Sequence, residues 1–352
     1  MCREQSREEQ LFNRFLQCRS QENCHLIDFI SNLGLPWLQP DFSPHSPYIL
    51  KSEQCWLRPP TYEDLHDRCI DRIISRKSDF QVYDAGEQPT ASVGRALRQL
   101  NQPNASNPTY ITNIQLPDHD MHFPEALRCL VTPHDDALHL GVNFTPKYTL
   151  IDLHIDQGLG GLSTAVGSCV KLWLLYPPKK HNLDVMRKMG NMKGRLQRIG
   201  KELKEGRQVI TTAEDTIYLP PGWIHAVYTI EGGALAGVTF MVGECIETVN
   251  HCITYELAVN KIYNSNLFLS AIQVTLELHD ERLIIEAIKM WCCIRPRLKM
   301  DEKTQSRARE IWDKHLESPG SHPKCPGCSW EGEDFVNHMR LTHIIHTSKR
   351  KR

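Results

Sequence analysis

The sequence predicts a mainly β core with accompanying helices, followed by a helical region and a small zinc finger. Between Phe80 and Gly243 it contains many short apolar runs separated by Gly, Pro, Asn and Asp. Many short strands with such turn residues between them are typical of a barrel or a sandwich. After Gly243 the apolar residues recur at helical spacing, and paired Cys and His residues follow near the C-terminus.

Length and composition limit the class of protein. The 352 residues suffice for one large domain with a small one, or for two. The 40% apolar and 24% charged residues are ordinary for a soluble globular protein, and no apolar run reaches the ~18 residues of a membrane span. The charged N-terminus is not a secretory signal, so the thirteen cysteines favour reduced thiols in an intracellular protein, some of them metal ligands. A net charge of −1 requires any nucleic-acid contact to come from local patches.

Residues 1–79 are predicted to be a helical and irregular region. Leu11, Phe15 and Leu16 recur near i, i+4 spacing, which predicts a helix. The stretch 34–48 is rich in proline and has to be irregular. A further short helix is expected from Tyr62 to Ser75.

Residues 80–247 are predicted to be the β core. A basic segment at 179–208 interrupts it, with ten Lys or Arg against three Asp or Glu. Because Leu196, Ile199 and Leu203 fall at helical spacing, the segment is predicted to be a helical insertion. It fits either a solvated helix face or a surface that contacts nucleic-acid phosphates. The expected strands lie at 80–84, 109–116, 139–144, 149–156, 170–177, 215–230 and 234–242.

Residues 248–318 are predicted to be helical, and Pro296 is expected to end the third helix. Residues 319–346 then form the zinc finger and 347–352 a basic tail. The expected helices lie at 247–263, 267–278, 281–294 and 303–317.

A histidine and an aspartate stand two residues apart in the predicted strand 149–156. Side chains at i and i+2 of a strand point to the same face, so His154 and Asp156 are expected to converge. A buried carboxylate needs an ionic partner, a hydrogen bond or a metal. The pair alone fits a His–Asp hydrogen bond in a core as well as a metal site.

His225 supplies a third candidate ligand, in an apolar run that follows a Pro-Pro-Gly turn. It lies far enough beyond His154 for the chain to return beside the first strand. Two histidines and a carboxylate are the facial triad of non-haem Fe(II) oxygenases, which leaves one side of the metal open. His154, Asp156 and His225 are therefore the expected iron ligands and catalytic residues.

Lys171 lies within another apolar strand. A lysine inside a core strand is rare unless it is paired. An ammonium in a dry pocket needs an anion, and the far carboxylate of 2-oxoglutarate is a suitable one. The alternative is that Lys171 extends to the rim of the barrel and keeps its ammonium in water.

The motifs "HID", "VKLWLLYPPKKHNL" and "YLPPGWIHAVYT" together resemble the JmjC domain, and among its members the histone lysine demethylases related to the F-box and CXXC-finger type. The resemblance runs from about Phe80 to Gly243. It implies a double-stranded β-helix, a jelly-roll of the cupin type, that holds Fe(II) at the three residues above. It also implies that Lys171 and Asn113 bind 2-oxoglutarate.

The chain departs from the family at the co-substrate site. The family's threonine, three residues before the first histidine, is replaced by Ile151, although Thr149 lies on the same strand face. A Trp-Tyr pair of the family is replaced by Ser163 and Thr164. The resemblance therefore implies intact iron chemistry, an altered co-substrate pocket and an open choice of substrate.

The C-terminal segment carries a candidate zinc site. Its pair spacings match a two-Cys, two-His finger, while its central spacing is shorter than the usual twelve. Because so short a segment cannot fold on an apolar core alone, metal binding is expected. His346 is a competing candidate for the fourth ligand position. The tail Lys349–Arg352 fits a nuclear-localisation signal, a phosphate contact or a solvated end. The four expected ligands have the spacing C-x2-C-x9-H-x4-H: Cys325, Cys328, His338 and His343.

These features predict a nuclear Fe(II)- and 2-oxoglutarate-dependent dioxygenase that acts on a histone tail or another chromatin protein, with lysine demethylation as the leading reaction. DNA contact is expected through the finger, the basic insertion or the tail, and no membrane partner is expected. The same site fits a JmjC protein hydroxylase. The alternative from another class is a catalytically silent chromatin-binding adaptor, which Ile151, Ser163 and Thr164 favour.

Overall fold

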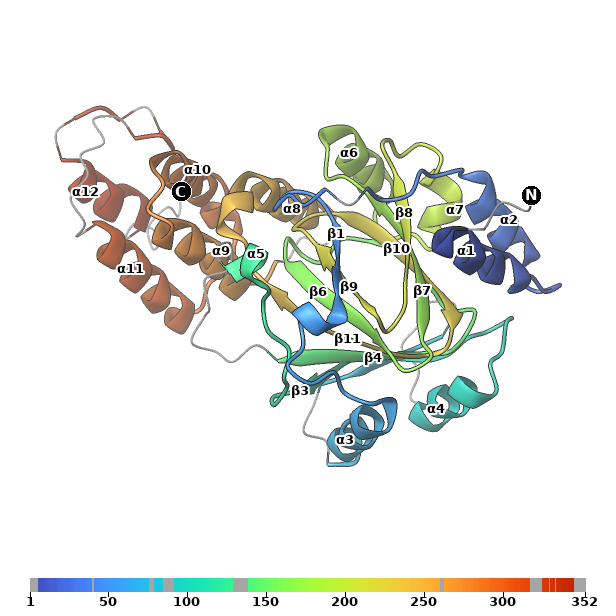
Figure 1. Ribbon diagram of the computed structural model, residues 1–352. Coiled ribbons are helices and arrows are strands. Elements are labelled where there is room, and N and C mark those ends of the chain that lie inside the picture. The colour runs from blue at the N-terminus through green and yellow to red at the C-terminus, as the bar shows by residue number, and fades with distance from the viewer. Residues whose placement is uncertain are drawn as a thin grey trace. The chain divides into compact units, whose positions relative to one another are not determined.

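The part of the chain that the structure describes falls into two compact units. The first contains the strands and the second the C-terminal helices (Figure 1). None of the described helices is long and apolar enough to cross a membrane. The computed structural model describes residues 6–39, 41–75, 79–84, 92–128, 139–259, 263–316, 325–328, 330–332 and 334–344.

Two antiparallel sheets form the first unit. The larger has seven strands in the order β1-β9-β6-β11-β4-β3-β2, and the smaller has four in the order β5-β10-β7-β8. This arrangement is consistent with the expected jelly-roll. The bounds are β1 Tyr48–Lys51, β2 Gln81–Tyr83, β3 Tyr110–Leu116, β4 Leu140–Thr145, β5 Leu150–His154, β6 Gly160–Val166, β7 Val170–Tyr176, β8 Arg207–Thr211, β9 Asp215–Leu219, β10 Ile224–Glu231 and β11 Gly233–Phe240.

The two sheets pack face to face around a buried apolar interior. Ala165, Ile217 and Leu235 from the larger sheet share one cluster with Trp173 and Val227 from the smaller. Because alternate side chains of a strand face the same side, these residues define which positions of each strand point into the barrel. The same alternation places the candidate site residues described below.

Helices of the N-terminal part surround the sheets. The third and fourth pack on β3 and β4 and so cover the outer face of the larger sheet, while the first packs on β8 (Figure 1). Ser6, Thr61 and Ser92 cap the first, third and fourth by accepting hydrogen bonds from backbone amides. The bounds are α1 Arg7–Gln17, α2 Cys24–Asn32, α3 Tyr62–Ile74, α4 Val93–Asn101 and α5 Glu125–Arg128, with a 3-10 turn at Ser52–Gln54.

Two short helices, α6 Lys180–Met189 and α7 Arg195–Ile199, lie in the basic segment between β7 and β8. Leu196 and Ile199 are buried, and the start of α7 is held by Asp152 of β5, whose carboxylate accepts the backbone N–H of Arg195 at 2.6 Å. The insertion is therefore anchored to the strand that carries His154.

The second unit is a bundle of helices. Helix α10 packs against α8 and α9, and α11 packs against α9 and the C-terminal turn. Pro296 lies in a 3-10 turn at Arg295–Arg297, directly after α10 ends, as expected from its missing N–H. The bounds are α8 Ile246–Val259, α9 Ser265–Glu277, α10 Glu281–Ile294, α11 Glu302–Leu316 and α12 Phe335–His338, with a 3-10 turn at Gly243–Cys245 and a π-helical turn at Met339–Ile344.

The structure contains elements that the sequence pattern did not predict. Strand β6 is rich in glycine and small residues, which lower strand propensity, yet it is held by hydrogen bonds to β9 and β11 on its two sides. Strand β8 lies at the end of the basic segment and pairs with β7. With helix α4 and strand β1 added, the chain is mixed α and β, not mainly β.

Gly237 of β11 sits against a neighbouring strand with no room for a side chain. A Cβ at this position would lie 2.7 Å from Ser163 Oγ and closer still to the Leu162 carbonyl oxygen. At Gly141, its partner on β4, the nearest atom to a Cβ would be the Gly237 carbonyl oxygen at 3.6 Å. We therefore expect Gly237→Ala to lower the free energy of unfolding by about 1–3 kcal/mol, and Gly141→Ala to change it much less. Urea unfolding of both variants measures the difference, and equal losses would contradict this packing.

Candidate active site and zinc cluster

Strands β5 and β10 bring two of the expected iron ligands together. His154 and His225 are directly opposite each other in the antiparallel pair, and their ring centroids lie 4.0 Å apart. Asp156 follows two residues after the end of β5. Its Oδ1 lies 3.5 Å from His154 Nε2 and its Oδ2 lies 3.7 Å from His225 Nε2. One possible ligand atom from each of the three residues lies within 4.8 Å of the others.

An irregularity in the pairing of β5 with β10 turns His154 to the interior. Val227 pairs with Ile151 while His225 pairs with His154, so β5 uses one more residue than β10 between the two pairs. A bulge of this kind re-aims side chains and is common beside active sites. It allows Ile151 and His154, three residues apart, to face the same side.

The backbone sets the tautomer of both histidines. Nδ1 of His154 lies 2.8 Å from the Asp152 carbonyl oxygen, and Nδ1 of His225 lies 3.0 Å from that of Trp223. Because a carbonyl only accepts, Nδ1 carries the proton and Nε2 presents its lone pair to the shared centre. The pKa of His225 is lowered to about 4, mainly by burial and also by His154, while Asp156 acts in the opposite direction. His225 is therefore a neutral imidazole at neutral pH, the form that binds metal.

Asp156 is less buried than the strand pattern predicts. Its side chain is 39% exposed, whereas that of His225 is 4% exposed. The reason is that β5 ends at His154, so Asp156 lies past the strand at the mouth of the barrel. The nearby Asp152 does not join the site, because its carboxylate accepts the backbone N–H groups of Leu153 and Leu196, each at 2.8 Å.

Lys171 lies inside the barrel. It is 1% exposed, and its ammonium donates to Thr145 Oγ1 and to Thr229 Oγ1, the latter at 2.8 Å. No carboxylate among the described residues lies within 4.0 Å of it. Burial lowers the pKa of the Lys171 ammonium, and the thiol of Cys169 raises it. An anion entering the barrel would meet a buried ammonium that has two hydroxyl partners and no counter-ion among the residues that the structure describes.

The two threonines were not predicted from the sequence. Thr229 lies four residues after His225 and pairs with Lys171 across β10 and β7, so strand alternation would have placed it on the interior face. Thr145 comes from the other sheet, and its contact with Lys171 depends on how the two sheets pack.

The remaining co-substrate candidates are placed as follows. Asn113 is exposed, and its φ is 64° at the point where the pairing of β3 with β4 shifts register. Its side-chain amide oxygen accepts a hydrogen bond from Gln115. Its backbone N–H donates to Asn143 Oδ1 at 2.8 Å. Ile151 packs on the interior cluster. The hydroxyl of Thr149 donates to the Pro146 carbonyl at 2.7 Å. The role of Asn113 stays a prediction.

Ser163 and Thr164 of β6 point to opposite sides. Thr164 is buried against Trp56, whose Nε1 donates to its Oγ1 at 2.9 Å, and it shares a second hydrogen bond with Thr216. Ser163 alternates with it and shares the face of Ala165, which belongs to the interior cluster. Only Ser163 therefore faces the barrel interior.

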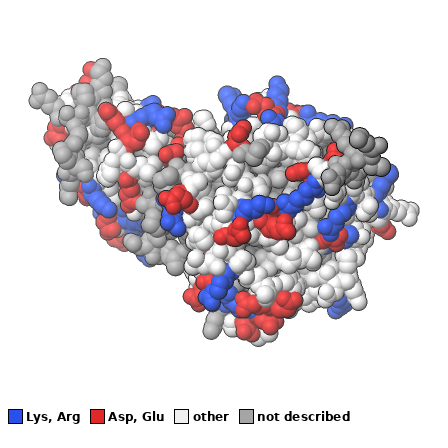
Figure 2. Space-filling view, viewed as in Figure 1, with Lys and Arg blue, Asp and Glu red and all other residues white. Residues whose placement is uncertain are grey.

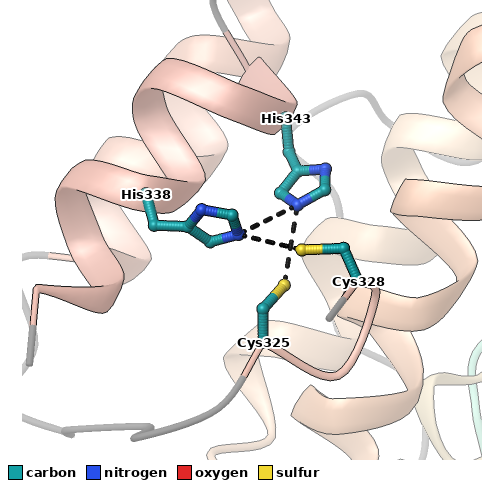
Figure 3. A group of neighbouring side chains, drawn as sticks. All are labelled: Cys325, Cys328, His338 and His343. Carbon is teal, nitrogen blue, oxygen red and sulfur yellow. Dashed lines mark hydrogen bonds between the residues drawn. The ribbon is translucent and has the colours of Figure 1, made fainter. Parts of the chain in front are cut away.

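The four expected zinc ligands meet in the second unit. Cys328 Sγ lies 3.3 Å from His338 Nε2, Cys325 Sγ lies 3.6 Å from His343 Nε2, and the two Nε2 atoms are 3.2 Å apart (Figure 3). Two thiols and two imidazoles are the donors that zinc prefers in a tetrahedral structural site. The donor set fits zinc, and all four ligand atoms lie within 4.8 Å of one another.

The other predicted nucleic-acid contacts have less support. The tail Lys349–Arg352 lies outside the described residues, and so does His346, the competing candidate for the fourth zinc position. In the basic segment, Asp184 pairs with Lys180 and Arg187, and Lys179 pairs with Glu205. Figure 2 accordingly shows blue and red side chains side by side in the region of α6. Part of the positive charge of this segment is thus neutralised locally.

Comparison with known proteins gives a distant and partial similarity. The chain is 25% identical over 181 residues to "JmjC domain-containing histone demethylation protein 1" of Emericella nidulans. It is 28% identical over 117 residues to the protein of the same name from Debaryomyces hansenii. The matches cover 51% and 30% of this chain, but only 11% and 22% of those proteins. No family model matches the chain.

Proposed function

We propose that this protein is an Fe(II)- and 2-oxoglutarate-dependent dioxygenase of the JmjC type. The observation that carries the proposal is the convergence of His154, Asp156 and His225 on one point, with the buried Lys171 on the strand next to β10. Two imidazoles and one carboxylate suit Fe(II) and leave coordination positions for a 2-oxoacid. The partial similarity to proteins named for histone demethylation supports the same class.

When bound, iron with 2-oxoglutarate would supply the oxidising chemistry, and the residues of the barrel would place the reactants. The backbone carbonyls of Asp152 and Trp223 fix the rings of His154 and His225 with Nε2 toward the metal position. Lys171 would bind the far carboxylate of the co-substrate, since its buried ammonium lacks a described counter-ion. The apolar interior excludes water around that ion pair and so strengthens it.

Small residues line the end of the barrel interior that holds His225. Ser163, Gly237 and Gly141 lie in one row across β6, β11 and β4. Lys171 contacts Thr145 and Thr229. Gly141 lies four residues before Thr145, and His225 likewise lies four residues before Thr229. The row therefore faces the His225 end of the interior, and we propose that a substrate side chain enters the barrel at this end.

The proposed substrate is a histone tail or another chromatin protein, and the proposed location is the nucleus. Lysine demethylation is the leading reaction, in keeping with the names of the matched proteins. Hydroxylation of an N-methyl group would release formaldehyde and so remove the methyl group. Hydroxylation of a carbon would leave a stable alcohol at the same site. Succinate release from 2-oxoglutarate, measured with Fe(II) and a panel of methylated and unmethylated histone peptides, tests the proposal, and formaldehyde release separates the two reactions.

A catalytically silent chromatin-binding adaptor is the second candidate. Ile151 supports it, because this side chain offers no hydroxyl to the co-substrate and packs in the interior cluster. The hydroxyl of Thr149 does not replace it, since it is bonded to the Pro146 carbonyl. Histone peptide binding without any stimulation of succinate release would favour the adaptor.

Removing the ammonium of Lys171 is expected to weaken the co-substrate selectively. A charge-assisted hydrogen bond is worth roughly 1.5–3 kcal/mol, so Lys171→Met should raise the KM for 2-oxoglutarate about 10- to 100-fold while Fe(II) affinity changes little. Methionine keeps most of the volume, which limits cavity effects. Lys180→Ala is the control, because that lysine is 88% exposed. An unchanged KM would assign Lys171 a purely structural role.

A further inference from the structure

Cys292 of α10 contacts the zinc cluster from outside the predicted finger. Its Sγ lies 3.3 Å from Nδ1 of His343. The other ring nitrogen of His343, Nε2, faces Cys325 Sγ and His338 Nε2. The imidazole of His343 is therefore held between the four-ligand group on one side and α10 on the other.

A metal-bound histidine needs a hydrogen-bond partner on its second ring nitrogen, which fixes its tautomer and its orientation. For His338 this partner is local, because Thr342 Oγ1 lies 3.3 Å from its Nδ1. For His343 the group in that position is the thiol of Cys292. With Nδ1–H directed at this sulfur, the lone pair of Nε2 is directed at the cluster.

The backbone of the finger also packs directly on α10. A Cβ at Gly327, between the two ligand cysteines, would lie 2.6 Å from Cys292 Cβ and closer still to its sulfur. The adjacent Trp291 donates from Nε1 to the His343 carbonyl oxygen at 3.1 Å. Two successive residues of α10 thus hold the side chain and the backbone of one ligand.

The apolar core extends across the same boundary. Cys325, Phe335 and Met339 belong to one buried cluster with Trp291 of α10 and Trp312 of α11. Arg340 also forms an ion pair with Asp313 of α11 at 2.9 Å. The zinc ligands are therefore built into the packing of the helical unit.

We propose that Cys292 is a positioning residue for the zinc ligand His343, so that metal loading and the packing of α10 are coupled. This inference rests on zinc being bound by the four-ligand cluster, and it is independent of the proposed oxygenase activity. On this account the finger is a metal-held part of the helical unit and not a separately folding reader.

The first test is zinc affinity, measured on the full chain by competition with a chromophoric chelator. Loss of such a supporting partner typically costs about 10- to 100-fold in metal affinity, and we expect this from Cys292→Ala. Cys292→Ser keeps an acceptor for Nδ1–H and should restore most of the affinity. Cys293→Ala is the matched control, because the neighbouring Cys293 is exposed. Unchanged affinity in Cys292→Ala, or absence of metal binding by the unchanged protein, would overturn the proposal.

The second test separates a positioning residue from a ligand. In cobalt(II)-loaded protein, the thiolate charge-transfer band reports the number of bound sulfurs. We expect Cys292→Ala to keep the full band at saturating cobalt, and a weaker band would make Cys292 a ligand and refute the positioning role.

The third test needs no substitution and so does not depend on how a variant folds. Alkylation of the unchanged, zinc-loaded protein should be slow at Cys292 and fast at Cys293, and chelation should accelerate the reaction at Cys292 but not at Cys293. Equal rates at Cys292 with and without zinc would contradict the coupling.

Discussion

Replacing Asp156 with alanine should abolish 2-oxoglutarate turnover. It should also weaken Fe(II) binding by more than about 100-fold, because loss of a residue that only supports a metal ligand already lowers metal affinity by up to about that factor. Among the described residues, Asp156 is the one carboxylate that approaches both histidines, with oxygens 3.5 Å and 3.7 Å from their Nε2 atoms. Without it the site keeps two imidazoles and loses its carboxylate. Titration of the anaerobic apoprotein with Fe(II), followed by a succinate assay, measures both effects.

Asp152 offers a matched control, because it also lies two residues from His154. Its carboxylate accepts backbone N–H groups at the start of α7 and does not face the metal position. Asp152→Asn should therefore lower stability by roughly 1 kcal/mol, as for a weakened helix cap, and leave Fe(II) affinity intact. If Asp152→Asn loses iron and Asp156→Ala keeps it, the ligand assignment is wrong.

Cys325→Ser should destabilise the whole helical unit. Structural zinc contributes an apparent 10–16 kcal/mol in finger peptides, which is comparable to the ~5–15 kcal/mol total stability of a domain. Cys325 is buried in the same apolar cluster as Trp291 and Trp312, so loss of the metal should loosen α10 and α11 and not the finger alone. Thermal unfolding by circular dichroism, with proteolysis mapped along residues 281–344, measures the extent.

The iron site should survive this substitution, because none of its ligands comes from the helical unit. We expect turnover of a short soluble peptide to be largely retained, while binding to chromatin or DNA weakens and falls with added salt. Cys293→Ser serves as the control. Loss confined to residues 325–344, with α10 and α11 unchanged, would show that the finger folds as a separate module.

The sequence predicts which candidate ligand residues come together better than it predicts their surroundings. The spacing of His154 and Asp156 and the apolar run around His225 suffice to predict a three-residue metal site, because strand alternation is a local property. The exposure of Asp156 could not be predicted, since it depends on where β5 ends. The bulge that turns His154 inward is visible only in the register between β5 and β10.

In the rest of the fold, too, local features are predictable from the sequence and contacts between distant segments are not. The apolar periodicity predicts the C-terminal helices, but β6 escapes it because its glycines and small residues depend on the strands on either side. Contacts between distant segments have no local signal. Thr145 reaches Lys171 from the opposite sheet, and Cys292 reaches His343 from a helix that precedes the finger.

One metal and one 2-oxoacid are proposed to bind together inside the barrel. Crystals grown without oxygen in the presence of Fe(II) and 2-oxoglutarate, with anomalous data at the iron edge, test this directly. We predict one iron peak within bonding distance of His154, Asp156 and His225, with the far carboxylate of 2-oxoglutarate at the Lys171 ammonium. An iron-free triad, or a Lys171 ammonium with no 2-oxoglutarate carboxylate beside it, would contradict this prediction.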